Sequence, residues 1–389
     1  MQDPIYLDNA ATSYPKPREV HDFMHEFYSA CGGNPGRTGY GMADRIDQVV
    51  SQTRRMLCEL FGGDDAKRLT FCYNASDALN QIIQGMLSPG DHVVTSYLEH
   101  NSVLRPLYHR EQAGEIEVDY IPCDAAGFIA PEAVRAAIRK NTRLVLLNHA
   151  SNVIGTVQPL GEVGKICRES GVCFAVDASQ TAGMIKINAS SMSIDLIAFT
   201  GHKSLLGPTG IGGIYTGEDV PIRATRFGGT GVNSERRTHL EEFPHRLECG
   251  TLNILGVAGL YAGQLWLREN GMEKIHAREM ELWERLRHGL QKIDGVTTYC
   301  ADSRENHTSV LGFNVAGWEA ADVGAILDAD YNITCRTGLQ CAPLVHEWLG
   351  TDKLFGTVRF SLGPFNTEEH IDSAVAAVAE IAAVRSNHN

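Results

Sequence analysis

The sequence predicts an α/β fold in which a large, mostly parallel sheet is followed by a small α+β domain. Between residues 69 and 199, apolar runs of strand length alternate with stretches whose apolar residues recur at helical spacing. Strands that alternate with helices in this way favour a parallel sheet with helices on both faces. The chain has 389 residues, which exceeds what one core usually supports and favours two domains.

Composition and charge narrow the classes of partner. With 43% hydrophobic and 21% charged residues, the chain is typical of soluble globular proteins. Its net charge of −13 argues against nucleic acid or an anionic membrane as a partner, because phosphate binding needs clustered lysines and arginines. The sequence contains no run of about twenty apolar residues, and its N-terminus lacks the basic head of a signal peptide. The ten cysteines form no C-x-x-C pair and no zinc-ligand spacing, so we expect free thiols in the cytoplasm and no metal.

The elements are expected in a regular order. Strands are predicted at residues 69–73, 92–96, 116–122, 143–149, 174–177, 196–199, 214–216, 310–315 and 357–362. Helices are predicted at residues 18–30, 43–61, 78–86, 160–170, 321–329 and 367–384, with another that begins near 131 and a long helical stretch over 254–293. The composition turns more polar near Asn270 and Gly271, so we expect a domain change in that stretch.

Two neighbouring apolar runs end abruptly in polar residues. Asp177 and Gln180 end the first run, and Thr200, His202 and Lys203 end the second. Ligands of open α/β sheets bind just beyond the carboxyl ends of the strands, so these side chains are expected to line one crevice. A lysine near a carboxylate at such a point suits pyridoxal phosphate, because the amine forms a Schiff base and the carboxylate keeps the pyridine nitrogen protonated. A solvated loop lysine and a helix-capping aspartate are an equal alternative for these runs alone.

A third strand end indicates an anion site. The strand at 69–73 passes through the small polar turn Asn74 to Asp77 into a helix. Such a turn presents free amide N–H groups at the helix start, and these attract phosphate. An ordinary helix cap by Ser76 or Asp77 is the alternative, and it is favoured when this motif is taken alone.

Two other loops bear on the ligand. His100 lies just past the strand at 92–96 and is placed to face the same crevice, although a surface histidine is the commoner outcome. The glycine-rich stretch at 207–213 does not spell G-x-G-x-x-G and precedes a strand instead of a helix. No Walker lysine–serine pair is present, so we reject a dinucleotide-binding or P-loop site.

A loop near the C-terminus holds a second nucleophile, Cys341. Arg336 and His346 are close to it in sequence. Positive neighbours lower the pKa of a thiol and expose a nucleophilic thiolate. The alternative is a buried, inert thiol, which is the usual fate of a free cysteine and which fits Cys335 better than Cys341.

Arg359 lies in an apolar, alternating run that is typical of a strand. An arginine in such a setting needs an anion, and a carboxylate bound by two parallel hydrogen bonds is its best geometric match. A substrate carboxylate and a structural ion pair within the chain are equal alternatives at this point.

Seven motifs, taken together and in order, are similar to those of a known family. They are Tyr6-Leu7-Asp8-Asn9-Ala10-Ala11-Thr12, Glu99-His100-Asn101, Ser151-Asn152-Val153-Ile154-Gly155, Val176-Asp177-Ala178-Ser179-Gln180, Thr200-Gly201-His202-Lys203, Arg336-Thr337-Gly338-Leu339-Gln340-Cys341-Ala342 and Arg359-Phe360-Ser361. The set resembles the class V aminotransferase-like family and, within it, the cysteine desulfurases and selenocysteine lyases. The resemblance runs from near the N-terminus to about residue 375, and the ordered set is far more specific than any one motif.

This resemblance implies the fold, the cofactor and the assembly. The fold would be PLP fold type I, with a large domain around a mostly parallel, seven-stranded mixed sheet and a small α+β domain. We accordingly assign residues 15–265 to the large, cofactor-binding domain, and residues 1–14 together with 266–389 to the small domain that carries the catalytic cysteine loop. The cofactor would be pyridoxal 5'-phosphate, and the protein would be a homodimer with its sites at the interface.

The resemblance also implies a role for each site residue. Lys203 would carry the cofactor and move the α-proton, Cys341 would attack the substrate sulfur, and His100 would stack on the ring and exchange protons. Asn152, Arg336 and Arg359 would bind the substrate carboxylate. The cofactor contacts would be Ala75, Ser76, His100, Asn152, Asp177, Gln180, Thr200, His202, Lys203 and, from the partner subunit, Thr251.

The implied activity is that of a cysteine desulfurase, which converts L-cysteine to L-alanine and leaves a persulfide on Cys341. A sulfur-acceptor protein and a role in iron–sulfur cluster assembly would follow, and the short loop resembles the SufS type. Relatives carry histidines where this chain has Leu339 and Gln340, and often at Tyr40, so a selenocysteine lyase or a cysteine/cystine β-lyase is the alternative. A sulfur-relay scaffold without turnover is a second one, against which Lys203 and Asp177 argue.

Overall fold

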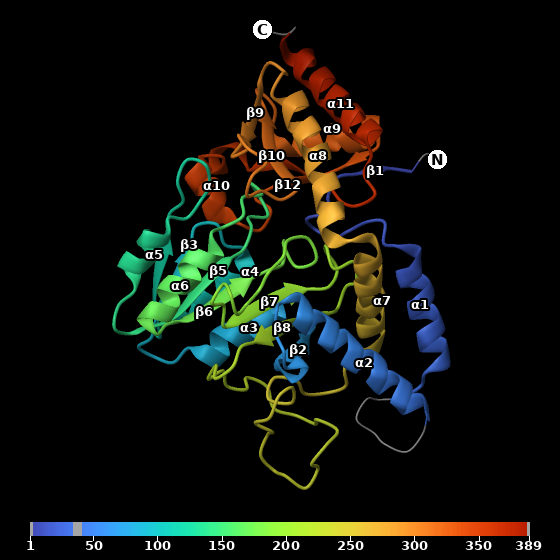
Figure 1. Ribbon diagram of the computed structural model, residues 1–389. Coiled ribbons are helices and arrows are strands. Elements are labelled where there is room, and N and C mark those ends of the chain that lie inside the picture. The colour runs from blue at the N-terminus through green and yellow to red at the C-terminus, as the bar shows by residue number, and fades with distance from the viewer. Residues whose placement is uncertain (1–2, 34–40, 387–389) are drawn as a thin grey trace.

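A seven-stranded sheet forms the centre of the chain in the computed structural model, which describes residues 3–33 and 41–386 (Figure 1). The strands lie in the order β2-β8-β7-β6-β5-β3-β4. Their bounds are β2 Leu69–Cys72, β3 His92–Ser96, β4 Glu117–Ile121, β5 Thr142–Asn148, β6 Cys173–Asp177, β7 Leu196–Thr200 and β8 Gly212–Thr216. Strand β8 runs antiparallel to both neighbours, and all the other neighbouring pairs are parallel. The predicted mixed, mostly parallel sheet is therefore confirmed.

Helices cover both faces of this sheet. They are α1 Arg18–Ala30, α2 Gly41–Leu60, α3 Ala75–Met86, α4 Asn101–Gln112, α5 Pro131–Ala137, α6 Leu160–Ser170 and α7 Ile254–Asn270. Alternate residues of β6 and β7 enter different apolar clusters: Phe174 and Phe199 belong to one, whereas Ala175 and Ala198 belong to the other. Burial of one such phenylalanine stabilises the fold by about 1.5–3 kcal/mol. Burial on both faces explains why these strands read as continuous apolar runs.

The start of α3 differs from the prediction. The helix begins at Ala75, three residues before the predicted start at residue 78. Its cap is Asn74, whose side-chain oxygen accepts a hydrogen bond from the N–H of Asp77 at 2.9 Å. The predicted cap by Ser76 or Asp77 was therefore wrong, and the Ser76 hydroxyl is not used to cap the helix.

The long helical stretch predicted over 254–293 consists of two helices. Helix α7 ends at Asn270, and α8 (Met272–Leu290) begins after a break at Gly271. The break coincides with the polar change in composition noted in the sequence. Helix α8 then leaves the large sheet and packs against the C-terminal elements (Figure 1).

A second, four-stranded antiparallel sheet has the order β12-β13-β10-β9. The elements of this region are β9 Val296–Tyr299, β10 Val310–Val315, α9 Ala320–Tyr331, β11 Ile333–Thr334, β12 Arg336–Gly338, α10 Pro343–Leu349, β13 Thr357–Ser361 and α11 Glu368–Ser386. Its core includes Leu7, Trp283, Phe313 and Phe360. Because Leu7 joins this core and β1 (Ile5–Tyr6) pairs with β11, the N-terminus packs with the C-terminal elements. The division at residues 14/15 and 265/266 stays a prediction.

Membrane spans, metal sites and disulfides were sought over residues 3–33 and 41–386, which the structure describes. None of the helices in these ranges is long and apolar enough to cross a membrane. In the same ranges, no group of three or more His, Cys, Asp or Glu side chains is placed to hold a metal ion. All ten cysteines carry free thiols.

The antiparallel pairing of β12 with β13 gives a test of the fold. Gly356 has a φ of +101°, and a Cβ there would lie 2.1 Å from the carbonyl oxygen of Gly338. We expect Gly356→Ala to lower the free energy of unfolding by about 3 kcal/mol or more, because strain and a backbone collision add. Gly350 has a φ of +70° but open space around a Cβ, so Gly350→Ala should lower it by only about 1 kcal/mol. Urea unfolding of the two variants measures the difference, and equal losses would contradict the described pairing of the two strands.

Candidate active site

One cavity of about 300 Å³ collects nearly all the predicted site residues. It lies where the carboxyl ends of strands β6 and β7 face the small sheet. Its lining includes Ala75, Ser76, His100, Asn152, Asp177, Gln180, Thr200, His202, Lys203, Arg336, Cys341 and Arg359. The structure therefore brings together residues that lie more than 280 positions apart in the sequence.

Thr251 is the exception. It is exposed and borders a different hollow, together with Arg54 and Glu248. Because this residue is expected to reach the site of a partner subunit, its position in a single chain leaves the prediction untested.

Asp177 ends β6 and lines the cavity. Its Oδ1 accepts hydrogen bonds from the N–H of Ser179 at 2.9 Å and from the Ser179 hydroxyl at 2.5 Å. These bonds hold the carboxylate in place through Oδ1. Asn148, at the end of β5, and Ala198 on β7 lie beside Asp177 in the sheet register.

Lys203 lies three residues beyond the end of β7. The loop that carries it is held by the N-terminal segment: the Ser13 hydroxyl donates to the Lys203 carbonyl at 3.0 Å, and the Ser13 N–H donates to the His202 carbonyl at 3.1 Å. Burial lowers the pKa of Lys203 to about 8, and Asp177 opposes this shift. The uncharged amine, which a nucleophile or base requires, is therefore far more populated near neutral pH than in a solvated lysine.

His100 is fixed in one orientation at the start of α4. Its Nδ1 accepts a hydrogen bond from the N–H of Ser102 at 3.0 Å, so it caps the helix. Burial and the charge of Lys203 lower the pKa of His100 to about 4. The ring is therefore neutral at physiological pH, and because Nδ1 accepts, the proton resides on Nε2.

The part of the cavity lined by Ala75, Ser76, Thr200 and His202 has polar groups without partners. The N–H groups of Ala75 and Ser76, in the first turn of α3, have no acceptor within the helix. Thr200 Oγ1 and His202 Nδ1 are buried and have no hydrogen-bond partner among the described residues. Since unpaired buried polar atoms are costly, a bound anion that satisfies all of them fits this end of the cavity.

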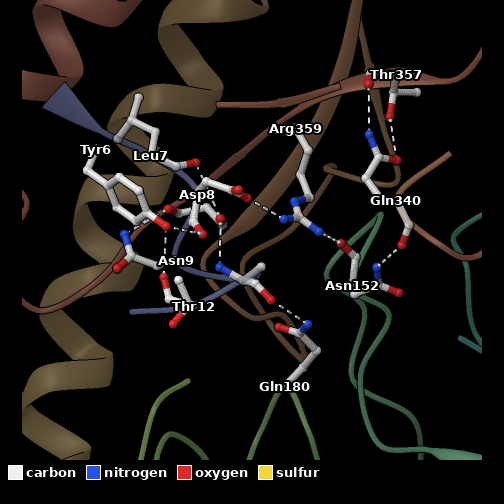
Figure 2. A network of polar contacts seen from close by, with 12 residues as sticks. Tyr6, Leu7, Asp8, Asn9, Thr12, Asn152, Gln180, Gln340, Thr357 and Arg359 are labelled. Atoms are coloured by element: carbon white, nitrogen blue, oxygen red, sulfur yellow. Dashed lines mark hydrogen bonds and ion pairs between the residues drawn. The ribbon is translucent and has the colours of Figure 1, made fainter. Parts of the chain in front are cut away.

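Arg359 is nearly fully buried, and its guanidinium joins two other segments (Figure 2). Nη2 lies 2.5 Å from Asp8 Oδ1, and Nη1 donates to the Asn152 carbonyl at 2.9 Å. The ion pair within the chain, one of the two alternatives for this arginine, is thus present. The ion pair and the bond to the Asn152 carbonyl each use one of the five N–H donors of the guanidinium. The wall that Arg359 and its cross-strand neighbour Arg336 form is therefore still cationic.

The loop of Cys341 is exposed and conformationally unusual. Gln340 and Cys341 have φ angles of +41° and +60°, both in the left-handed region that non-glycine residues seldom adopt. Cys341 is exposed, whereas burial raises the pKa of Cys335 to about 12. This difference in exposure agrees with the expectation that Cys341 is the reactive thiol and Cys335 the inert one.

His346 is not the positive neighbour that the sequence suggested for Cys341. Its ring is fully buried, and burial lowers its pKa to about 4, so it is neutral. It contacts the side chain of Gln340 instead. Arg336 is the predicted cation that does line the cavity with Cys341.

Several residues at the site were missed in the sequence. Ser179 and Ser102 orient Asp177 and His100, and their positions two residues after each partner were the available signal. Glu99 is buried and accepts hydrogen bonds from the Ser96 hydroxyl and the Asn148 N–H, which joins the ends of β3 and β5. Burial raises the pKa of Glu99 to about 8, so its carboxyl is mostly protonated at neutral pH.

Known proteins provide an independent comparison. The family model for class-V aminotransferases matches residues 5–373. A probable cysteine desulfurase of Methanothermobacter thermautotrophicus is 33% identical, over 98% of this chain and 96% of that protein. The mitochondrial cysteine desulfurase of Candida albicans is 32% identical, over 97% of this chain and 76% of that protein.

Solved structures give the same picture. The apo cysteine desulfurase of Thermococcus onnurineus NA1 has a TM-score of 0.90 at 32% identity, over 98% of this chain and 95% of that one. The cysteine desulfurase CsdA of Escherichia coli has a TM-score of 0.87 at 29% identity, with the same coverage. The family match over almost the whole chain, and a cavity whose donors suit a phosphate and whose lysine lies near a carboxylate, lead to one conclusion: the chain belongs to the class V aminotransferase family, whose members use pyridoxal phosphate.

Proposed function

We propose that this protein is a pyridoxal phosphate-dependent cysteine desulfurase, which converts L-cysteine to L-alanine and retains the sulfur on Cys341 as a persulfide. The observation that carries the proposal is that one cavity holds both Lys203 with Asp177 and the exposed thiol of Cys341. The relatives named cysteine desulfurase support the same activity.

The residues of the cavity are suited to hold the cofactor. The start of α3, with Thr200 and His202, would bind the phosphate, and Asp177 would contact the ring nitrogen. When bound, pyridoxal phosphate supplies an aldehyde for the Lys203 amine and a ring that withdraws electrons from the substrate Cα. The Gln180 amide donates to the Ala10 carbonyl at 3.1 Å, which leaves its oxygen for a ligand.

The substrate carboxylate would bind the cationic wall of Arg336 and Arg359. Asp8 neutralises part of this charge. The N–H donors of the two guanidinium groups that are still free bind a carboxylate more strongly than a neutral group. Asn152 has one amide hydrogen engaged by the Gln340 carbonyl at 2.7 Å, and its other hydrogen is available to the substrate.

Lys203 would move the proton of the substrate Cα, and Cys341 would take the substrate sulfur. The uncharged Lys203 amine takes the proton from the substrate Cα. The Cys341 thiolate then attacks the substrate sulfur, so that an S–S bond forms as the substrate Cβ–S bond breaks. The electron pair of the broken bond goes to Cβ, which takes up a proton. The Lys203 ammonium returns its proton to Cα, and the products are alanine and Cys341–S–SH.

The persulfide on Cys341 must be passed on to an acceptor. The exposure of Cys341 suits a sulfur-acceptor protein. A homodimer would supply Thr251 to the neighbouring site. The free thiols suit the cytoplasmic location expected from the sequence, and iron–sulfur cluster assembly is the expected destination of the sulfur.

The direct test supplies the holoenzyme with L-cysteine and L-selenocysteine separately and measures alanine and protein-bound sulfur. We expect one alanine for each sulfur released from cysteine. Pyruvate and ammonia in place of alanine would indicate β-elimination, and turnover of selenocysteine alone would indicate a selenocysteine lyase; either result would contradict the proposal.

The two cysteines of the loop region provide a matched pair of variants. Cys341→Ala should lower alanine formation from cysteine at least 100-fold, because the nucleophile for the substrate sulfur is lost, while the absorbance of the bound cofactor is kept. Cys335→Ala should retain activity within about twofold, since that thiol is partly buried and has a raised pKa. Unchanged alanine output from Cys341→Ala would remove this thiol from the mechanism.

The pKa of Lys203 predicts the pH dependence of cofactor loading. Only the uncharged amine attacks an aldehyde, so the loading rate of cofactor-free protein should rise with pH, with its midpoint near pH 8, and level off well above that midpoint. Stopped-flow absorbance between pH 6 and 10 measures this, with butylamine as the reference amine. Asp177→Asn should shift the midpoint to lower pH, because Asp177 raises the pKa of Lys203. A midpoint near 10.5, the value of a solvated lysine, would contradict this description of the site.

A further inference from the structure

The side chain of Gln340 lies inside the protein, although its neighbours Leu339 and Cys341 are exposed. Its Nε2 donates to the carbonyl of Thr357, on β13, at 2.8 Å. Its Oε1 lies 2.9 Å from Nε2 of His346, on α10, and accepts from the Thr357 hydroxyl at 3.3 Å. Both ends of the amide are therefore used, and the side chain ties the cysteine loop to two other elements.

The partner histidine is also fixed. Since Gln340 Oε1 only accepts, His346 Nε2 must donate, and Nδ1 must accept from the Thr351 hydroxyl at 2.8 Å. His346, Thr351 and Thr357 are all buried. The connection is thus a chain of neutral hydrogen bonds without access to water.

The backbone of the same loop is held by contacts with the large domain. The Gln340 carbonyl accepts from Asn152 Nδ2 at 2.7 Å (Figure 2). The Cys341 carbonyl accepts from the N–H of Asn101, which follows His100, at 2.7 Å. Two consecutive left-handed residues strain a loop, so this conformation requires such external contacts to persist.

We propose that Gln340 is a positioning residue that fixes the Cys341 thiol for its attack on the substrate sulfur. Its side chain holds the loop on the small sheet, while its carbonyl connects the loop to Asn152 and, through the Asn152 carbonyl, to Arg359. The thiol is thereby placed relative to the groups that would bind the substrate carboxylate. This inference rests on the proposed function and deepens it.

Gln340 and Lys203 lie in loops that are held by different sets of hydrogen bonds. The Lys203 loop is held by hydrogen bonds from Thr12, Ser13 and Lys16 to the His202 and Lys203 carbonyls, and none of these bonds involves the Cys341 loop. A change at residue 340 should therefore act on sulfur transfer and leave proton removal at the substrate Cα intact. These two steps are measurable separately, because exchange of the alanine α-hydrogen in D2O needs the cofactor and Lys203 but no thiol.

The test uses holoenzyme with Gln340→Met, which keeps the length of the side chain and removes its hydrogen bonds. We expect kcat for alanine formation from cysteine to fall at least tenfold, while α-hydrogen exchange of L-alanine stays within twofold of the wild type. Leu339→Ala is the matched control in the same loop; its side chain is exposed, and kcat should stay within twofold. If Gln340→Met does not accumulate, Gln340→Asn withdraws the amide from His346 and should give the same pattern.

A double variant adds a readout that a general loss of structure would not give. His346→Phe removes the same contact from the other side, so the loss in Gln340→Met/His346→Phe should not exceed the larger single loss. Additive losses, a parallel fall in α-hydrogen exchange, or full kcat in Gln340→Met would each overturn the positioning role. The proposed function stands in those cases if Cys341→Ala is inactive, whereas a wild-type enzyme that forms no alanine from cysteine would overturn both.

Discussion

The balance between burial and charge at Lys203 is the constraint on which the site depends. Burial disfavours the ammonium form and outweighs the attraction of Asp177, so that the pKa of Lys203 falls to about 8. The same low-polarity setting keeps His100 and His202 neutral. Charge in the cavity is therefore concentrated on a few groups, chiefly Asp177 and the two arginines of the small sheet.

The sheet topology produces this arrangement. Strands β5, β6 and β7 are parallel, so their polar ends meet at one edge. The N-terminal segment crosses from the small core, which contains Leu7, to the Lys203 loop, where Ser13 binds two carbonyls. Along the way, Asp8 pairs with Arg359. One short segment thus connects the amine, the cationic wall and the small sheet.

The sequence was most informative where backbone periodicity decides the structure. The order of strands and helices, the bounds of α1 and α6, and the grouping of Asp177, Thr200 and Lys203 at strand ends all follow from local patterns. Contacts between distant side chains were not accessible in this way. The side chains of Gln340 and His346 meet because α10 folds back on the loop, and Asn74 caps α3 because of a backbone turn whose start the propensities did not fix.

Covalent attachment at Lys203 is the most direct test of the account. Reduction of the holoenzyme with borohydride should trap the cofactor on its amine, and peptide mass spectrometry should find the pyridoxyl phosphate label on the peptide that contains Lys203. We expect this single site to carry the label and Lys203→Ala to carry none. A label on another lysine, or a wild-type protein that takes up no cofactor, would contradict the account.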